Sequence, residues 1–334
     1  MLPQRCLCLL SACIFVPLAA SPAFASHIDD ENAATPVTTA SSQQVVATQR
    51  TVEAVFDHLA NLAVEIPDLK TGVSTGDTPL GINLWINPSY TRAHDDNSVI
   101  GYTSKTYGAF FGGDKALGNA TLGLMLGIDH TDLDSKSNGG GSDTQGLTIA
   151  PYGRYKFNRT YSLDLTAGFT SSQADNDRLG FTGNRVTSDS DTKRWFAALG
   201  LNGSYWLDRW NFLGRAGTTL SHDRRGAFTE SDGTAVNSDS SAFGQAQLGM
   251  TVSRYFTHLR PWVSATYAYD YRRKFAEVAA WQPQPSHDRS QMVLGLGLTV
   301  FGYGSVVGDL GIKQTVMRED YTNTQVGLTL SVPF

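Results

Sequence analysis

The carboxy-terminal stretch of the chain alternates strictly between apolar and polar residues. One parity is wholly apolar and ends on an aromatic residue; it consists of Val326, Leu328, Leu330, Val332 and Phe334. The other parity carries small or polar residues such as Thr329 and Ser331. Because successive side chains of a strand point to opposite faces, this segment predicts a strand with one apolar and one polar face. A transmembrane β-barrel needs such strands, apolar toward lipid and polar toward the lumen; the edge strand of a β-sandwich is the alternative.

The same alternation recurs from Leu80 to the end of the chain, in twelve stretches. Their centres are Trp85, Gly108, Leu124, Ile149, Leu165, Leu199, Gly214, Leu248, Thr266, Leu296, Leu310 and Leu328. The third stretch, for example, places Leu122, Leu124 and Leu126 on one face. An even number of strands is what a closed bacterial barrel requires. The sequence therefore predicts an all-β transmembrane barrel of twelve antiparallel strands over residues 80–334.

The connections between these stretches alternate in length. The short turns are Ala116–Asn119, Phe157–Thr160, Leu207–Arg209, Phe256–His258 and Gly302–Gly304. The long polar connections are Ala93–Ile100, Thr131–Thr144, Gln173–Asp191, His222–Ser240 and Arg272–Arg289. The last hairpin, near Arg318–Tyr321, breaks the rule. Short turns in the periplasm and long loops outside are typical of outer-membrane barrels, so both ends of the barrel are expected on the periplasmic side.

A secretory signal peptide is predicted over residues 1–25. An apolar stretch runs from Cys6 to Ala20, and a small-x-small site predicts cleavage between Ala25 and Ser26. The alternative is a lipoprotein signal with Cys13 as the lipidated residue. All three cysteines, Cys6, Cys8 and Cys13, lie inside the signal. The mature chain therefore offers no disulfide, thiol nucleophile or cysteine metal site.

A helix is predicted between the signal and the barrel. Residues 26–41 are rich in Ala, Thr, Ser, Asp and Glu and are expected to be disordered. From Val45 onward, apolar residues recur at spacings of three and four, which predicts a helix over residues 42–66 that Pro67 ends. Residues 67–79 form a linker. At about 1.5 Å per residue the helix could cross a small barrel, and we expect it in the lumen; a surface helix on a soluble domain is the alternative.

Composition narrows the function classes. The chain has 334 residues, of which 17% are charged, and a net charge of −5. This balance excludes the basic footprint of a nucleic-acid-binding protein. After the signal no stretch of about eighteen apolar residues occurs, which excludes helical membrane spans.

Charged residues occupy lumen-side parity positions of the predicted strands. They are Arg154, Lys156, Asp164, Arg215, Arg260, Asp309 and Lys313. Such charges could bias an ion or peptide path, or they could tie the helix to the barrel wall through its Arg50, Glu53 and Asp57. We favour the second interpretation because twelve strands enclose little more room than a helix needs.

Enzyme chemistry receives little support. Four histidines, His94, His130, His222 and His287, stand next to acids in the predicted outer loops or strand ends. Proteases of the omptin type use such pairs to activate water, so a surface protease is a minor alternative. The chain has no Gly-x-Ser-x-Gly elbow and no metal-ligand spacing. We therefore assign no catalytic residue, cofactor or metal.

The order of these parts resembles the carboxy-terminal translocator domain of autotransporters, the type V secretion family. Similar stretches are Leu80-Gly81-Ile82-Asn83-Leu84-Trp85, Tyr107-Gly108-Ala109-Phe110-Phe111-Gly112-Gly113-Asp114 and Pro151-Tyr152-Gly153-Arg154-Tyr155. The resemblance implies a non-enzymatic protein-transport barrel in the outer membrane of a Gram-negative bacterium, reached after Sec-type export. It implies outer-membrane lipid, periplasmic chaperones and the barrel-assembly machinery as partners, the machinery recognising the final strand. We expect a monomer.

The sequence departs from the family pattern at its N-terminal end. Only residues 26–41 precede the helix after the predicted cleavage, too few to bury the core of a large passenger. The helix also lacks the Asn-Asn pair of self-cleaving members. We therefore expect membrane passage or surface display of a short N-terminal segment; a stand-alone pore or an adhesin-like surface barrel is the alternative.

Overall fold

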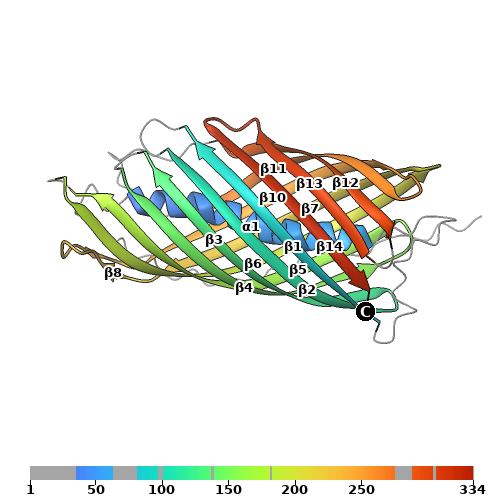
Figure 1. The fold of residues 1–334 in the computed structure, drawn as a ribbon, viewed down its shortest axis with the longest axis horizontal. Helices are drawn as coiled ribbons and strands as arrows, with labels where there is room; N and C mark the ends of the chain where they lie inside the picture. The colour runs from blue at the N-terminus through green and yellow to red at the C-terminus, as the bar shows by residue number, and fades with distance from the viewer. Residues whose placement is uncertain are drawn as a thin grey trace, which may run out of the picture.

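Twelve antiparallel strands close into a barrel around one helix (Figure 1). The computed structural model describes residues 35–62, 81–96, 101–136, 139–180, 183–274, 288–303 and 306–333. The barrel strands are β1 (Ile82–Asp95), β2 (Tyr102–Leu117), β3 (Ala120–Ser135), β4 (Gly141–Lys156), β5 (Tyr161–Leu179), β6 (Arg185–Leu207), β7 (Trp210–Arg225), β10 (Asp239–Arg254), β11 (Leu259–Lys274), β12 (Ser290–Tyr303), β13 (Val306–Val316) and β14 (Tyr321–Pro333). The predicted strand number and fold class are confirmed, and each predicted centre lies in one of these strands.

The barrel closes where the first strand pairs with the last. Leu84 of β1 lies opposite Val332 of β14, and Asp95 lies opposite Tyr321 at the other end of the same pair. Every other barrel strand pairs with the strands before and after it in the chain. Between β7 and β10, which pair with each other, β8 and β9 form a separate two-stranded sheet. This closure leaves no unpaired edge, which a sheet surrounded by lipid cannot tolerate.

The alternation of the sequence becomes an alternation between lipid and lumen. In β14, Val326 and Leu330 are exposed on the outside, whereas Thr329 and Ser331 are buried inside. Leu328 and Val332 of the same outward parity are half-buried, and Phe334 lies outside the described residues. The outer wall thus presents the apolar surface that a bilayer requires.

The long connections are more ordered than the sequence predicted. Much of the expected loops Thr131–Thr144 and Gln173–Asp191 consists of strand. In the first loop, β3 ends only at Ser135 and β4 already begins at Gly141; in the second, β5 ends at Leu179 and β6 begins at Arg185. These extensions are mostly polar, with isolated inward apolar residues such as Leu133 and Val186, so alternation does not reveal them. Their ladder continues in register, with Asp175 opposite Asp189.

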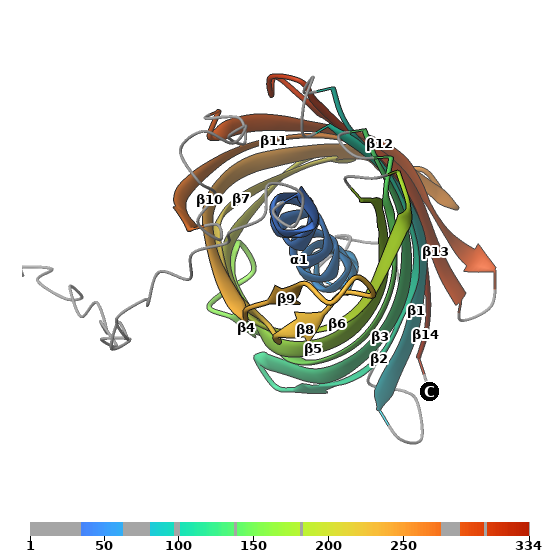
Figure 2. The ribbon, with the colours of Figure 1, turned by 90° about the vertical axis from the view of Figure 1, so that its left-hand side faces the viewer.

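A small hairpin, β8 (Phe228–Thr229) and β9 (Ala235–Val236), folds back from the β7–β10 connection. It lies at the mouth of the barrel on the long-connection side (Figure 2). Arg178 of β5 forms a buried ion pair with Glu230 in this hairpin. The pKa of Asp232 at the hairpin tip lies below its usual range, because the backbone N–H of Thr234 donates to its carboxylate.

The helix α1 (Thr35–Leu62) runs lengthwise through the barrel (Figure 2). It begins before the predicted start at Ser42, so residues 35–41, expected to be disordered, are helical. Among the described residues, no helix has the length and apolar character needed to span a membrane. The predicted signal and its Ala25–Ser26 cleavage site, residues 26–34, the expected last helical turn and the linker 67–79 lie outside the described residues.

Candidate functional site in the barrel lumen

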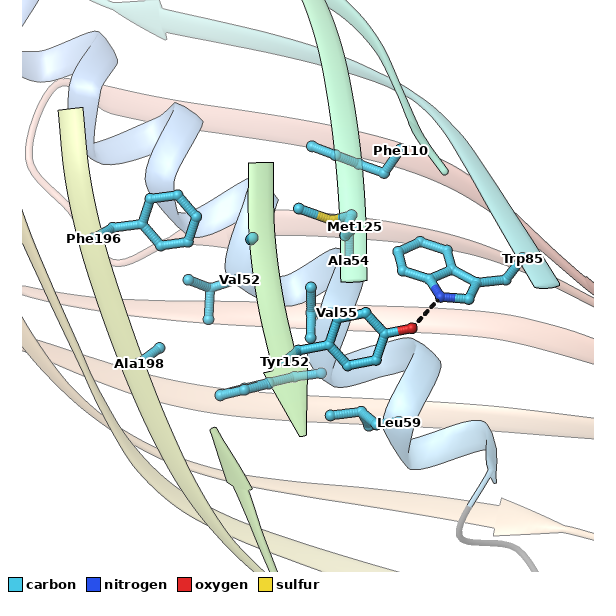
Figure 3. Close-up of a cluster of buried hydrophobic side chains, with 12 residues drawn as sticks. Val52, Ala54, Val55, Leu59, Trp85, Phe110, Met125, Tyr152, Phe196 and Ala198 are labelled. Carbon is cyan, nitrogen blue, oxygen red and sulfur yellow. Dashed lines mark hydrogen bonds between the residues drawn. The ribbon is translucent and has the colours of Figure 1, made fainter. Parts of the chain in front are cut away.

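One side of α1 is apolar and packs against residues of β1 to β4 and of β6 on one side of the barrel wall (Figure 3). The buried helix residues are Val52, Ala54, Val55, Phe56 and Leu59, and the buried wall residues are Trp85, Phe110, Met125, Ala150, Tyr152, Phe196 and Ala198. Val55 and Leu59 are completely buried. Most of a helix's stability in a protein comes from the packing of its apolar face, so this contact supplies much of the stability of α1.

Inward aromatic rings fit over glycines on neighbouring strands. A Cβ added at Gly112 of β2 would lie 2.3 Å from Trp85, and one added at Gly123 of β3 would lie 2.3 Å from Tyr152. Real Cβ atoms do not approach so closely, so the rings of Trp85 and Tyr152 need these glycines to lie where they contact α1. The inward glycines thus shape the wall to receive the helix.

A buried polar cluster joins the helix to this apolar wall. His58 Nε2 lies 2.7 Å from Asp114 Oδ2, and its ring stacks on Trp85 with the ring centroids 4.6 Å apart. The Tyr152 hydroxyl donates to the same carboxylate oxygen at 2.8 Å and accepts from Trp85 Nε1 at 2.6 Å. Asn83 Nδ2 also donates to Asp114, at 3.4 Å. These contacts favour one orientation of the helix, because turning it would leave the Asp114 carboxylate buried without its partner His58.

The C-terminal part of α1 is held through its backbone carbonyls. Arg154 Nη1 donates to the carbonyl of Leu59, and Arg215 Nη2 donates to that of Phe56 at 3.1 Å. The carbonyl of Leu59 lies close to the last described residue of α1, Leu62, and a cation near the C-terminal end of a helix complements the helix dipole. Asp164 is completely buried and accepts from Arg154 Nη2 at 2.7 Å, which compensates its charge.

The opposite side of α1 is polar and faces β11 to β13. Glu53, Asp57 and Asn61 follow one another at spacings of four residues and therefore share a face. Lys313 Nζ donates to Glu53 at 3.0 Å and to Asp57 at 2.7 Å. Arg260 donates to the side chain of Asn61. Two wall cations thus pair with one helix face.

The helix leaves a gap on this polar side. The cavity has a volume of about 120 Å³ and is lined by residues of α1 and of β7 and β10 to β13, among them Arg260, Trp262 and Lys313. The indole Nε1 of Trp262 donates to Asp309 at 3.1 Å. The seat of the helix is therefore tight on the β1–β6 side and looser on the other.

The N-terminal half of α1 contacts the end of the barrel that bears the long connections. Val46 packs in a buried cluster with Ala93, Tyr102, Leu133 and Tyr321. Ala93 and Leu133 lie near the ends of β1 and β3, and Tyr102 and Tyr321 lie at the starts of β2 and β14. All four positions are at the end of the barrel that bears the long connections. Because Leu59 and Asn61 contact the wall at the short-turn end, α1 enters at the short turns and points its N-terminus toward the long connections.

Arg50 is nearly completely buried in this half of the lumen. Its Nη2 lies 3.5 Å from Asp129 Oδ1 of β3, and its guanidinium lies 5.3 Å from the centre of the Phe110 ring. A Cβ at Gly108 would lie 2.8 Å from the same guanidinium. The glycine therefore provides the space that a buried arginine on the helix requires.

The charges predicted to face the lumen contribute unequally. Arg154, Arg215, Arg260 and Lys313 donate directly to α1. Asp164 and Asp309 act through these arginines, since Asp309 Oδ2 lies 3.8 Å from Arg260 Nη2. Lys156 is half-buried at the end of β4. Sequence reasoning missed Asp114 as the partner of His58, because only the fold brings these two residues together.

The histidine–acid neighbours do not form a catalytic group among the described residues. His94 Nε2 lies 2.9 Å from Asp96, whose pKa lies below its usual range because the Lys136 ammonium donates to it. His130 Nδ1 lies 3.3 Å from Asp143 on the next strand. Asp223, the neighbour of His222, accepts from Arg194, and His287 lies outside the described residues. Within the described residues, no group of three or more His, Cys, Asp or Glu could hold a metal ion.

Comparisons with known proteins agree on one fold. The family model of the autotransporter β-domain matches residues 84–301. The translocator domain of the autotransporter NalP from Neisseria meningitidis is similar, with a TM-score of 0.72 at 14% identity over 90% of this chain and 100% of that chain. The β-domain of the Bordetella autotransporter BrkA gives 0.62 at 16% identity over 76% and 99% of the two chains. The transport unit of the autotransporter AIDA-I from Escherichia coli gives a TM-score of 0.58 at 15% identity, over 83% of this chain and 97% of that chain. No curated protein sequence matches.

Proposed function

We propose, from the premise that this chain belongs to the autotransporter β-domain family, that its barrel passes the residues preceding α1 to the cell surface and that α1 then stays in the lumen as a plug. Barrels of this family lie in the outer membrane of Gram-negative bacteria and are not themselves enzymes. The direction of α1 carries the proposal, because its N-terminus points to the long-connection end.

The contacts of α1 suit a plug that is seated once and retained. The backbone carbonyls near its C-terminal end bind wall arginines, and its two sides match an apolar wall and a cationic wall. A segment in transit must slide along the lumen, whereas these side-chain contacts favour one register. We infer that the chain stops moving when His58 reaches Asp114 and Glu53 reaches Lys313.

Two earlier steps belong to the same proposal. After Sec-type export a signal peptidase would remove residues 1–25, and sequencing the N-terminus of the membrane-bound protein should give Ser26 as its first residue. The barrel-assembly machinery, with periplasmic chaperones, would then insert the barrel by recognising the final strand with Val326, Leu328, Leu330, Val332 and Phe334. The exposed outer faces of Val326 and Leu330 support this role.

The direction of display can be tested on intact cells. An epitope inserted after Asp30 should bind antibody without permeabilisation, because residues before α1 would lie outside. The same epitope inserted after Arg159, in the short turn between β4 and β5, should bind only after permeabilisation and serves as the matched control. Access to the N-terminal epitope only in permeabilised cells would contradict the proposal.

A further inference from the structure

Two cations lie directly opposite each other on the lipid-facing side of β6 and β7. The register places Lys193 opposite Arg224, and both side chains are exposed on the outward parity. The next outward pair toward the membrane is Trp195 with His222. Trp195 is 63% exposed, and its ring packs beside that of Phe169 on β5 with the centroids 4.5 Å apart, so the two rings form an outward aromatic surface.

The same arrangement occurs on β1 and β2. Arg92 lies opposite Lys105, and the next outward pair toward the membrane is Tyr90 with Tyr107. The two tyrosine rings contact each other with their centroids 5.1 Å apart. On two different parts of the barrel, an outward pair of cations therefore lies two residues from an outward pair that contains aromatic rings. In both cases the cations are nearer to the long connections.

Such pairs are unfavourable in the protein alone, because like charges directly opposite each other destabilise a sheet. Within the part of the chain that the structure describes, none of these four cations has a salt bridge. On the far side of the pair, Lys193 lies opposite Ser171 of β5, and Arg224 lies opposite Ser240 of β10, so neither cation has an acidic residue directly opposite it. Lys105 has the acidic neighbour Asp132 on β3, so the β6–β7 pair is the one less compensated by protein.

The aromatic pairs fix the depth of these cations. Outward aromatic residues form girdles at the two interfaces of the bilayer. The outward face of β6 runs from Trp195 to Leu207, which at about 3.3 Å per residue and a tilt of about 40° spans roughly 30 Å, close to one hydrocarbon core. Lys193 and Arg224 therefore lie just beyond the hydrocarbon of the outer leaflet, at the level of the lipid headgroups.

We propose that Lys193 and Arg224, the cation pair less compensated by protein, bind a phosphate of a phosphorylated glycolipid in the outer leaflet. One phosphate between two opposed cations removes their repulsion and accepts charge-assisted hydrogen bonds from both. Trp195 would contact the start of the acyl chains. The proposal relies on the outer-membrane location and is independent of the plug.

Native mass spectrometry of the full chain in detergent can test this site, with lipid A bearing two phosphates as the probe. The variant carries Lys193→Gln and Arg224→Gln. It should bind the lipid roughly 30-fold more weakly, about 2 kcal/mol for two cations at a headgroup. The matched control carries Arg159→Gln and Arg209→Gln, which removes two cations from the short turns, and should bind as the unaltered chain does.

The further arms separate the sources of the phosphate. Lipid A without phosphates should bind the unaltered chain as weakly as the variant binds the phosphorylated lipid. Equal binding of phosphorylated lipid by the variant and the unaltered chain would overturn the proposal, as would undiminished binding of the dephosphorylated lipid. Full displacement of the lipid by inorganic phosphate at equal concentration would show a free-anion site and would also overturn it. Heat-modifiable mobility of both variants verifies that their barrels are assembled.

Discussion

Leu59 offers a way to loosen α1 without touching the barrel wall. Its side chain is completely buried in the cluster between the helix and β1 to β6. Leu59→Ala removes buried methyl groups and leaves a cavity, which costs about 2–5 kcal/mol at such sites. The loss acts on the seated helix alone, because an unseated helix has no such contact. At about 3 kcal/mol, the ratio of unseated to seated helix should rise roughly 150-fold.

The readout is the fraction of time that single molecules in planar bilayers spend in a high-conductance state. This fraction should rise strongly for Leu59→Ala, with unchanged heat-modifiable mobility of the barrel. Leu62→Ala is the matched control, because Leu62 is only half-buried at the helix end and should raise the fraction far less. Equal open fractions in Leu59→Ala and the unaltered chain would refute the reasoning that apolar packing seats the helix.

Three further predictions concern the wall, the final strand and the topology. Gly112→Ala forces Trp85 to move, since the new Cβ would lie 2.3 Å from the ring; at a cost of about 1–3 kcal/mol, the barrel should lose its folded gel mobility at a lower temperature, and an unchanged temperature would count against the close fit. Leu330→Asp places a charge on the lipid face, costs up to about 2 kcal/mol and should lower the heat-modifiable fraction in membranes; full assembly would contradict the role of the final strand. Asn237→Cys should react with an impermeant maleimide on intact cells and Arg159→Cys should not; the reverse would invert the topology.

The strands were predictable because lipid and lumen impose opposite polarity on alternate residues. Leu124 and Leu126 are exposed outside, and Met125 between them is completely buried. The extensions of β5 and β6 do not follow this rule, because most of their residues are polar on both faces. Their order depends on partners distant in sequence, such as Arg178 and Glu230, which are 52 residues apart.

The helix shows the same limit. Its apolar stripe identified the segment around Leu59, but the turns from Thr35 onward are rich in Thr and Ser and carry no stripe. Periodicity placed Glu53 and Asp57 on one helix face without indicating that Lys313 pairs with both. The contact of His58 with Asp114 joins residues 56 positions apart and depends on the closure of the barrel.

The central claim is that α1 occupies the lumen of the assembled barrel. Single-channel conductance of the full chain, compared with a chain that lacks residues 26–66 and retains the signal, tests it most directly. The account predicts that the shortened chain still assembles into a heat-modifiable barrel and conducts at a clearly higher level than the full chain. Equal conductance of the two assembled barrels would contradict the account and place the helix outside the pore.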